Sequence, residues 1–169
     1  MDWQELYINN YRRAVTSLEK QLSDLAPEAI NRQPEPGSNS IGWIAWHIAR
    51  AQDRHLSNVF AVEQLYITDG WYRKFGREAD PKDSGTGHSP EQATAFNAPD
   101  AATLLDYHQV VIERCAGLIQ SLSAADLDSP PNYPGARPGS SIGGWLGGML
   151  GHSYQHLGEI GYLRGLLKI

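Results

Sequence analysis

One short stretch of the sequence, residues 151–160, reads GHSYQHLGEI. In a helix, His152 and His156 lie one turn apart on the same face, because residues four positions apart are neighbours there. Two imidazoles at this spacing can bind one divalent metal ion, but two ligands alone make a weak site. The stretch therefore predicts a helix whose histidine pair needs a third ligand from elsewhere in the fold.

The third ligand is expected in a second apolar run, residues 42–49, which reads GWIAWHIA. If this run is also helical, His47 can face the pair His152 and His156 from a neighbouring helix. Three neutral imidazoles leave a coordination position for water or substrate, which is typical of catalytic rather than structural sites. A structural interpretation stays open, in which each histidine is a hydrogen-bonded core residue and no metal binds.

The composition of the chain limits its fold and its partners. Its 169 residues suit a single domain, 1–169. Hydrophobic residues make up 41% of the chain and charged residues 20%, which is an ordinary composition for a soluble globular protein. A net charge of −5 disfavours nucleic acid and anionic membranes as partners. The sequence shows neither an apolar run of membrane-spanning length nor a signal-peptide pattern at Met1, so we expect a cytoplasmic protein. The single cysteine, Cys115, is expected to pack as a small hydrophobic residue.

Hydrophobic periodicity indicates an all-α fold. The predicted helices span about residues 2–25, 41–60, 100–122 and 142–167. Residues that favour helix N-termini precede each of them: Asp2, Ser38 to Ser40, Asp100, and Ser140 or Ser141. Residues 129–139, SPPNYPGARPG, are expected to form an irregular connection to the last helix.

The last predicted helix is rich in glycine, with the pattern IGGWLGGMLG at its start. Each interior glycine costs about 1 kcal/mol relative to alanine, so this many glycines need a compensating gain. We expect neighbouring helices to approach them closely. His152, His156, Glu159 and Arg164 interrupt the segment and argue against a membrane helix.

Residues 61–99 are the least regular part of the chain. Their aromatic residues suggest a short amphipathic piece, and residues 89–92, SPEQ, predict the start of a short helix. Long ordered loops are often functional, so His88 is a candidate acid, base or lid residue. The simpler interpretation is an exposed loop histidine with no role.

Two indoles and two further histidines are candidates for supporting roles. Trp43 and Trp46 flank His47, where they are expected to shield a metal from water and to contact a cofactor; alternatively, both are core or interface residues. His108 is expected to face inward, either as a partner of a metal-bound imidazole or as a hydrogen-bonded core group. The sequence assigns no role to His55.

With these residues in view, the sequence resembles the DinB-like family. This family includes thiol S-transferases of the YfiT kind and is related to the metal-binding domain of mycothiol-dependent maleylpyruvate isomerase. The likeness covers nearly the whole chain and rests on residues 40–53, SIGWIAWHIARAQD, and residues 151–159, GHSYQHLGE, with YLRGLL at 162–167. Residues 83–91, DSGTGHSPE, resemble one branch of the family.

The resemblance implies a four-helix bundle with a long crossover between its second and third helices, often dimeric. It also implies a three-ligand metal site at His47, His152 and His156. Glu159, on the same face as His156, is then an outer-shell base or a fourth ligand, or else a simple helix carboxylate. The implied cofactors are a divalent metal ion, above all zinc or nickel, and a low-molecular-weight thiol such as mycothiol or bacillithiol.

The function that we expect is a metal-dependent thiol S-transferase. In such an enzyme the metal lowers the pKa of the thiol, which then attacks an electrophilic small molecule. One alternative is a metal-dependent hydrolase, which uses the open coordination position for water. Another is a non-catalytic metal-containing binding or stress-response protein, which a fourth ligand from His108 or Glu159 would favour.

Overall fold

In a computed structural model of the chain, residues 1–133 and 136–169 are described, and their regular structure is helical throughout. The prediction of an all-α fold is therefore confirmed. The long helices are α1 (Trp3–Leu22), α3 (Ile41–Phe60), α7 (Ala101–Ile119) and α8 (Ile142–Leu167). The short ones are α2 (Pro27–Asn31), α4 (Leu65–Thr68), α5 (Trp71–Lys74), α6 (Pro90–Ala95) and the 3₁₀ helix η1 (Ala125–Asp128). Pro134 and Gly135, in the predicted irregular connection, lie outside the described residues.

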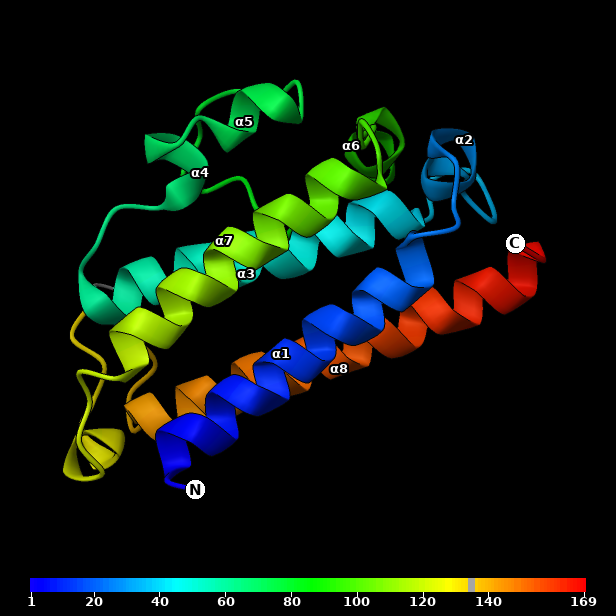
Figure 1. The fold of residues 1–169 in the computed structure, drawn as a ribbon. Helices are drawn as coiled ribbons and strands as arrows, with labels where there is room; N and C mark the ends of the chain where they lie inside the picture. Colours follow the sequence, from blue (N-terminus) through cyan, green and yellow to red (C-terminus); the bar gives the residue numbers. More distant parts are fainter. Residues whose placement is uncertain (134–135) are drawn as a thin grey trace.

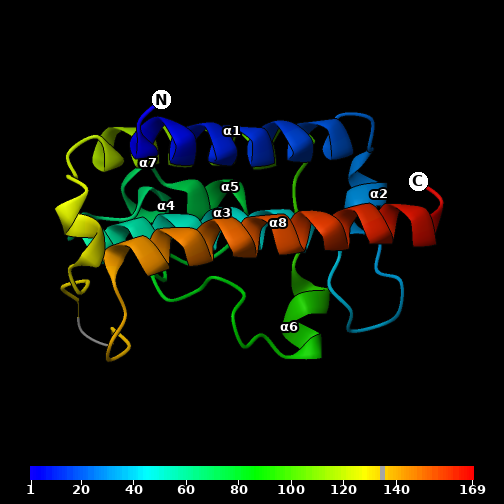
Figure 2. The ribbon, with the colours of Figure 1, turned by 90° about the horizontal axis from the view of Figure 1, so that it is seen from below.

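The long helices pack in a ring, in which α1 contacts α7 and α8, and α3 also contacts α7 and α8 (Figure 1). In Figure 1, α1 and α8 run in one direction and α3 and α7 run in the opposite one. Because α3 and α7 are parallel, the chain between them must return over the length of α3, which is about 30 Å. Residues 61–100 make this return and carry α4, α5 and α6, so the predicted long crossover is confirmed. Figure 2 shows the crossover running alongside α3 toward α6.

Capping side chains fix where the long helices begin, as the sequence predicted. Asp2 forms a capping box with Glu5, and the side chains of Ser40, Asp100 and Ser141 accept hydrogen bonds from backbone N–H groups three residues ahead. Two helices end three residues earlier than predicted, because the chain turns there. The N–H of Leu25 donates to the carbonyl of Leu22 at the end of α1, and Leu122 donates to Ile119 at the end of α7.

Helix α3 is buried on all sides in its first half. Every residue from Ile41 to Asp53 is buried, because α7 and α8 cover one side and the crossover covers the other. A helix in such surroundings is apolar all round rather than amphipathic. This position explains why polar residues of α3, His47 among them, lie inside the fold.

The close helix packing predicted at the glycines of α8 is wrong for most of them. A Cβ atom added at Gly147, Gly148, Gly151, Gly158 or Gly165 would meet no described atom within 4 Å. These glycines are exposed. Close approach does occur at Gly143, whose added Cβ would lie 3.2 Å from the Leu127 side chain, and at Gly161, whose added Cβ would lie 3.3 Å from the Gln21 side chain of α1.

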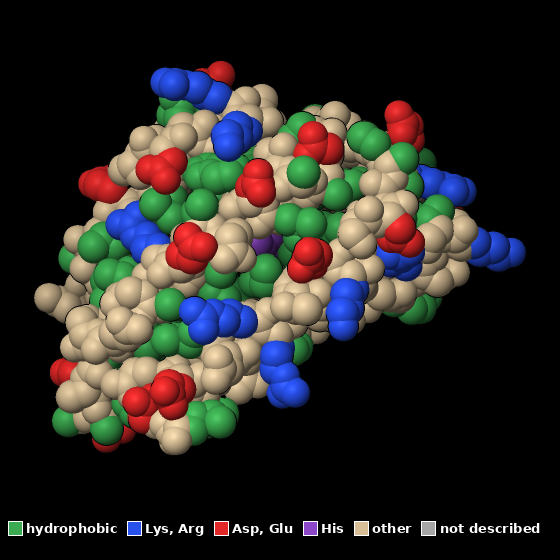
Figure 3. All heavy atoms as spheres, in the orientation of Figure 1, with side chains coloured by type: hydrophobic (Ala, Val, Ile, Leu, Met, Phe, Trp, Pro, Cys, Tyr) green, Lys and Arg blue, Asp and Glu red, His purple; other side chains and the backbone are tan. Residues whose placement is uncertain are grey.

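The surface charges and the helix lengths of the described residues are relevant to the prediction that the protein binds neither nucleic acid nor membranes. Lys and Arg side chains are interspersed with Asp and Glu on the face shown in Figure 3. None of the described helices is both long enough and apolar enough to cross a membrane. Cys115 is buried in the core, as predicted, and burial raises the pKa of its thiol to about 12.

Candidate metal centre

The structure brings His47 of α3 together with His152 and His156 of α8. One ligand nitrogen from each ring lies within 4.8 Å of the others, and Nε2 of His47 is 3.1 Å from Nε2 of His152. The bond lengths of a tetrahedral zinc site place its ligand nitrogens about 3.3 Å apart. The three side chains, which come from two neighbouring helices, could therefore hold a metal ion.

Hydrogen bonds at the far nitrogens of two rings orient them toward the cluster. Nδ1 of His47 donates to the backbone carbonyl of Ser84, and Nδ1 of His156 lies 2.6 Å from Oε2 of Glu159. A neutral imidazole that donates from Nδ1 carries its lone pair on Nε2. In both rings Nε2 is therefore the unprotonated nitrogen, which is the form that a metal ion binds.

Burial favours the neutral form of two of the ligand rings, His47 and His152. It lowers the pKa of His47, and it lowers the pKa of His152 to about 3, with smaller contributions from the neighbouring imidazoles of His156 and His47. Nδ1 of His152 is buried and has no hydrogen-bond partner among the described residues. This ring is therefore the one of the three whose orientation depends on packing and on what occupies the cluster.

The indoles of Trp43 and Trp46 belong to the same helix, α3, as His47. The Trp43 ring stacks on His47 with a centroid distance of 5.0 Å and an interplanar angle of 16°. Trp46 is fully buried and packs against Phe96 at 4.8 Å. The Trp43 indole therefore covers one face of the His47 ring, and contact of either indole with a cofactor stays a prediction.

His88 does not lie free on the surface but closes a hydrogen-bonded chain over the indoles. The indole N–H of Trp43 donates to Nδ1 of His88 at 3.2 Å, and Nε2 of His88 lies 3.0 Å from Oδ1 of Asp83. The other carboxylate oxygen of Asp83 pairs with Arg77 at 2.6 Å. His88 thus holds Trp43 against His47, which sequence reasoning missed because the partners are far apart in the chain.

A loop glycine allows the crossover to approach the cluster. Gly85 has a φ of +84°, and a Cβ added there would lie 2.7 Å from the Trp43 ring and 3.1 Å from Nδ1 of His47. Glycine is needed for both reasons, since other residues rarely adopt this φ and would also collide with the two rings. The adjacent carbonyl of Ser84 can therefore reach His47.

A buried ion pair fixes the crossover to α3. Arg50 and Asp53 are 0% and 1% exposed, and their charged groups lie 3.5 Å apart. The carboxylate of Asp53 accepts hydrogen bonds from the backbone of Leu65 and Tyr66, and Arg50 donates to the carbonyl of Asp83 at 2.9 Å. The signal for this network was present in the sequence, as two opposite charges three residues apart inside an apolar run.

The remaining histidines do not join the cluster. His108 is buried, and its Nε2 donates to the carbonyl of Ala45 at 2.8 Å, so it is the core group that the sequence analysis offered as one alternative. His55 packs edge-on against Trp145, with a centroid distance of 4.2 Å. Glu159 and His108 were the residues considered as a fourth metal ligand. Glu159 is instead hydrogen-bonded to His156, and His108 to the carbonyl of Ala45.

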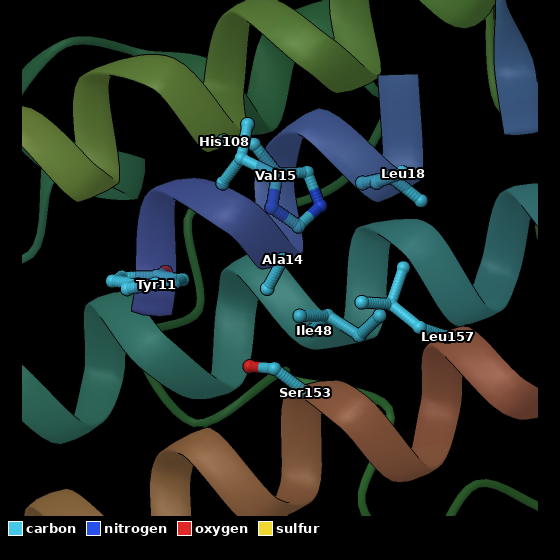
Figure 4. A pocket seen from close by; sticks show the side chains of 8 residues that line it. All are labelled: Tyr11, Ala14, Val15, Leu18, Ile48, His108, Ser153 and Leu157. Atoms are coloured by element: carbon cyan, nitrogen blue, oxygen red, sulfur yellow. The ribbon is translucent and has the colours of Figure 1, made fainter. Parts of the chain in front are cut away.

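One member of the cluster, His152, borders a cavity of about 740 Å³, a size that suits a small molecule. His152 forms part of its lining, with His55, Trp145 and residues of the connection before α8. A second void lies in the core, where side chains of α1, α3, α7 and α8 meet (Figure 4). Its volume of about 10 Å³ leaves little room even for water, so it is a packing feature.

The protein is thus an all-helical one in which three histidines of neighbouring helices converge and could hold a metal ion. The family model of the DinB superfamily matches residues 10–160, and the chain belongs to this superfamily.

Two solved bacterial structures have a similar fold. A conserved protein from Enterococcus faecalis superposes with a TM-score of 0.84 at 21% identity, over 98% of this chain and 97% of that one. A DinB-like protein from Bacillus cereus superposes with a TM-score of 0.63 at 21% identity, over 94% of this chain and 88% of that one. At this identity the likeness concerns the fold. Among curated proteins, no match to the chain is found.

Proposed function

We propose that this protein is a divalent-metal-dependent enzyme that transfers a low-molecular-weight thiol to an electrophilic small molecule. The observation that carries the proposal is the convergence of His47, His152 and His156 beside a cavity of about 740 Å³. Membership of the DinB superfamily supports it, because the sequence resembles the thiol transferases related to that superfamily. Zinc or nickel is the ion that we expect, and mycothiol or bacillithiol the thiol.

In this proposal the chain supplies three imidazole ligands, and a bound ion would keep a position for the thiol. His47, His152 and His156 would hold the ion through Nε2, while Ser84 and Glu159 orient two of the rings. When bound, the ion lowers the pKa of a coordinated thiol and so makes a thiolate available at neutral pH.

The transfer itself is a substitution at the electrophile. The thiol sulfur forms a bond to the electrophilic carbon, the leaving group departs with the bonding electrons, and the thiol proton passes to solvent. Trp43 covers one face of the His47 ring and keeps water from it. The cavity beside His152 is the side from which thiol and electrophile would approach.

A metal-dependent hydrolase would use the same cluster with water in place of the thiol. A non-catalytic metal protein would be favoured by a fourth protein ligand. The engagement of Glu159 with His156, and of His108 with the Ala45 carbonyl, supports an open site over a closed one. An open site suits either enzyme, and the resemblance to thiol transferases favours the transferase over the hydrolase.

The test is a product assay with the zinc- or nickel-loaded protein, chlorodinitrobenzene as electrophile, and mycothiol, bacillithiol or glutathione as thiol. We expect product formation that requires both metal and thiol and that the His156→Ala variant lacks. Turnover of a chromogenic ester without any thiol would instead support the hydrolase. Full metal loading without turnover in either assay would favour the non-catalytic protein.

We also propose a homodimer and a cytoplasmic location, which the family resemblance and the sequence pattern imply. Light scattering during size-exclusion chromatography tests the first. A mass near that of one chain, 18.7 kDa, would contradict the dimer, and twice that mass would support it.

A further inference from the structure

We propose that the cavity beside His152 binds a small organic anion with an apolar body, whose acidic group pairs with Arg137. This inference rests on the proposed function and deepens it, because it names the substrate class. The electrophile would carry a carboxylate or a similar acidic group.

The cavity lies between the second half of α3, the connection that precedes α8, and the first three turns of α8. The side chains that line it include His55, Tyr133, Arg137, Trp145, Met149 and His152. Its volume of about 740 Å³ lies within the range of small-molecule sites. A molecule bound there would be in contact with the proposed metal ligand His152.

The charge of the lining favours an anion. Among the described lining residues, Arg137 is the side chain with a fixed charge, and aspartate and glutamate are absent, although the whole chain has a net charge of −5. A guanidinium group matches a carboxylate with two parallel hydrogen bonds. A divalent ion held by the imidazoles would add positive charge beside His152, which lines the cavity.

The lining also provides apolar surface. The rings of Tyr133 and Trp145 meet edge-on, with a centroid distance of 5.9 Å and an interplanar angle of 72°, and Met149 lies on the same wall. Aromatic faces and a thioether favour contact with a flat apolar body. The preferred ligand is therefore an anion that also has a ring or a hydrocarbon part.

His55 contributes a polar group without charge. Its ring lines the cavity, and its Nδ1 is buried with no hydrogen-bond partner in the described part of the chain. Burial lowers its pKa to about 4, so the ring is neutral at physiological pH. The preference for an anion thus depends on Arg137 rather than on His55.

The test is calorimetric titration of the purified protein with naphthoate and with its neutral counterpart naphthylmethanol, before and after zinc loading. We expect naphthoate to bind about fivefold more tightly than the alcohol, a modest factor because Arg137 is exposed. Arg137→Met should remove this preference. Arg13→Met, which changes an exposed arginine on α1, is the matched control and should retain it.

A second variant tests the location of the site. Gly148 lines the cavity, and a Cβ added there would meet no described atom within 4 Å, so Gly148→Phe should place its ring in the cavity and abolish binding of both ligands without unfolding the protein. Equal affinity for the two ligands, a preference that survives Arg137→Met, or unchanged binding in Gly148→Phe would each overturn the proposal. Metal content, measured on the same samples, separates this outcome from a failure of the proposed metal site.

Discussion

The carboxylate of Glu159 lies 2.6 Å from Nδ1 of His156, one turn further along α8. A carboxylate in this position fixes the tautomer of a metal-binding imidazole and increases its basicity. We predict that Glu159→Gln lowers the affinity for zinc roughly 10- to 100-fold and leaves the fold intact. Competition with a chelating dye measures the affinity, and Glu19→Gln on the exposed face of α1 is the control. Equal zinc affinity in the Glu159→Gln variant and the parent would show that Glu159 is a simple helix carboxylate.

Gly85 and Gly87 form a matched pair for testing how the crossover meets the cluster. Both have positive φ, but an added Cβ collides with the Trp43 ring and approaches Nδ1 of His47 at Gly85, and meets nothing described at Gly87. We predict that Gly87→Ala costs about 1 kcal/mol of stability from backbone strain. Gly85→Ala should cost more and should also weaken zinc binding, because it displaces His47. Urea unfolding and zinc titration measure the two effects, and identical behaviour of the two variants would contradict this account.

The buried pair Arg50 and Asp53 should be a main source of stability for the crossover. Asp53→Ala leaves the Arg50 charge buried without its partner and frees the backbone N–H groups of Leu65 and Tyr66. We predict a loss of about 3 to 5 kcal/mol in the free energy of unfolding. Asp106→Ala, an exposed aspartate on α7, should change it by less than about 0.5 kcal/mol. Similar losses in both variants would argue against this role.

His108 should make stability depend on pH. Burial lowers its pKa from 6.5 to about 4, so the unfolded chain takes up a proton at a higher pH than the folded protein does. The stabilisation is therefore complete above pH 6.5 and is lost as the pH falls toward 4, by roughly 3 kcal/mol in all. We predict that His108→Leu flattens the pH dependence of urea unfolding in this range, measured in the presence of a chelator. An unchanged pH dependence would mean that other groups cause it.

Local sequence patterns were enough to predict the long helices and the residues that cap them. The pattern of apolar positions is set by each helix itself, and Ser40, Asp100 and Ser141 bond to backbone groups three residues away. The expectation about the α8 glycines failed because a low helix propensity does not reveal which face a residue occupies.

The candidate cluster was predicted from its spacing, but its surroundings were not. His152 and His156 are close in the chain, and His47 stood out beside two indoles. The partner of His47 is a backbone carbonyl at Ser84, which has no residue-type signal. The contacts of His88 with Trp43 and Asp83 depend on how the crossover folds back, and that path follows from tertiary packing around Arg50.

We propose above all that His47, His152 and His156 bind one metal ion between α3 and α8. Elemental analysis of the purified, untagged protein tests it most directly, together with His47→Ala, His156→Ala and the control Asp106→Ala, an exposed residue of α7 outside the cluster. We predict about one equivalent of metal per chain in the parent and in Asp106→Ala, and its loss in the other two variants. A parent that binds no ion after addition of zinc or nickel, or full metal content in both cluster variants, would contradict the account.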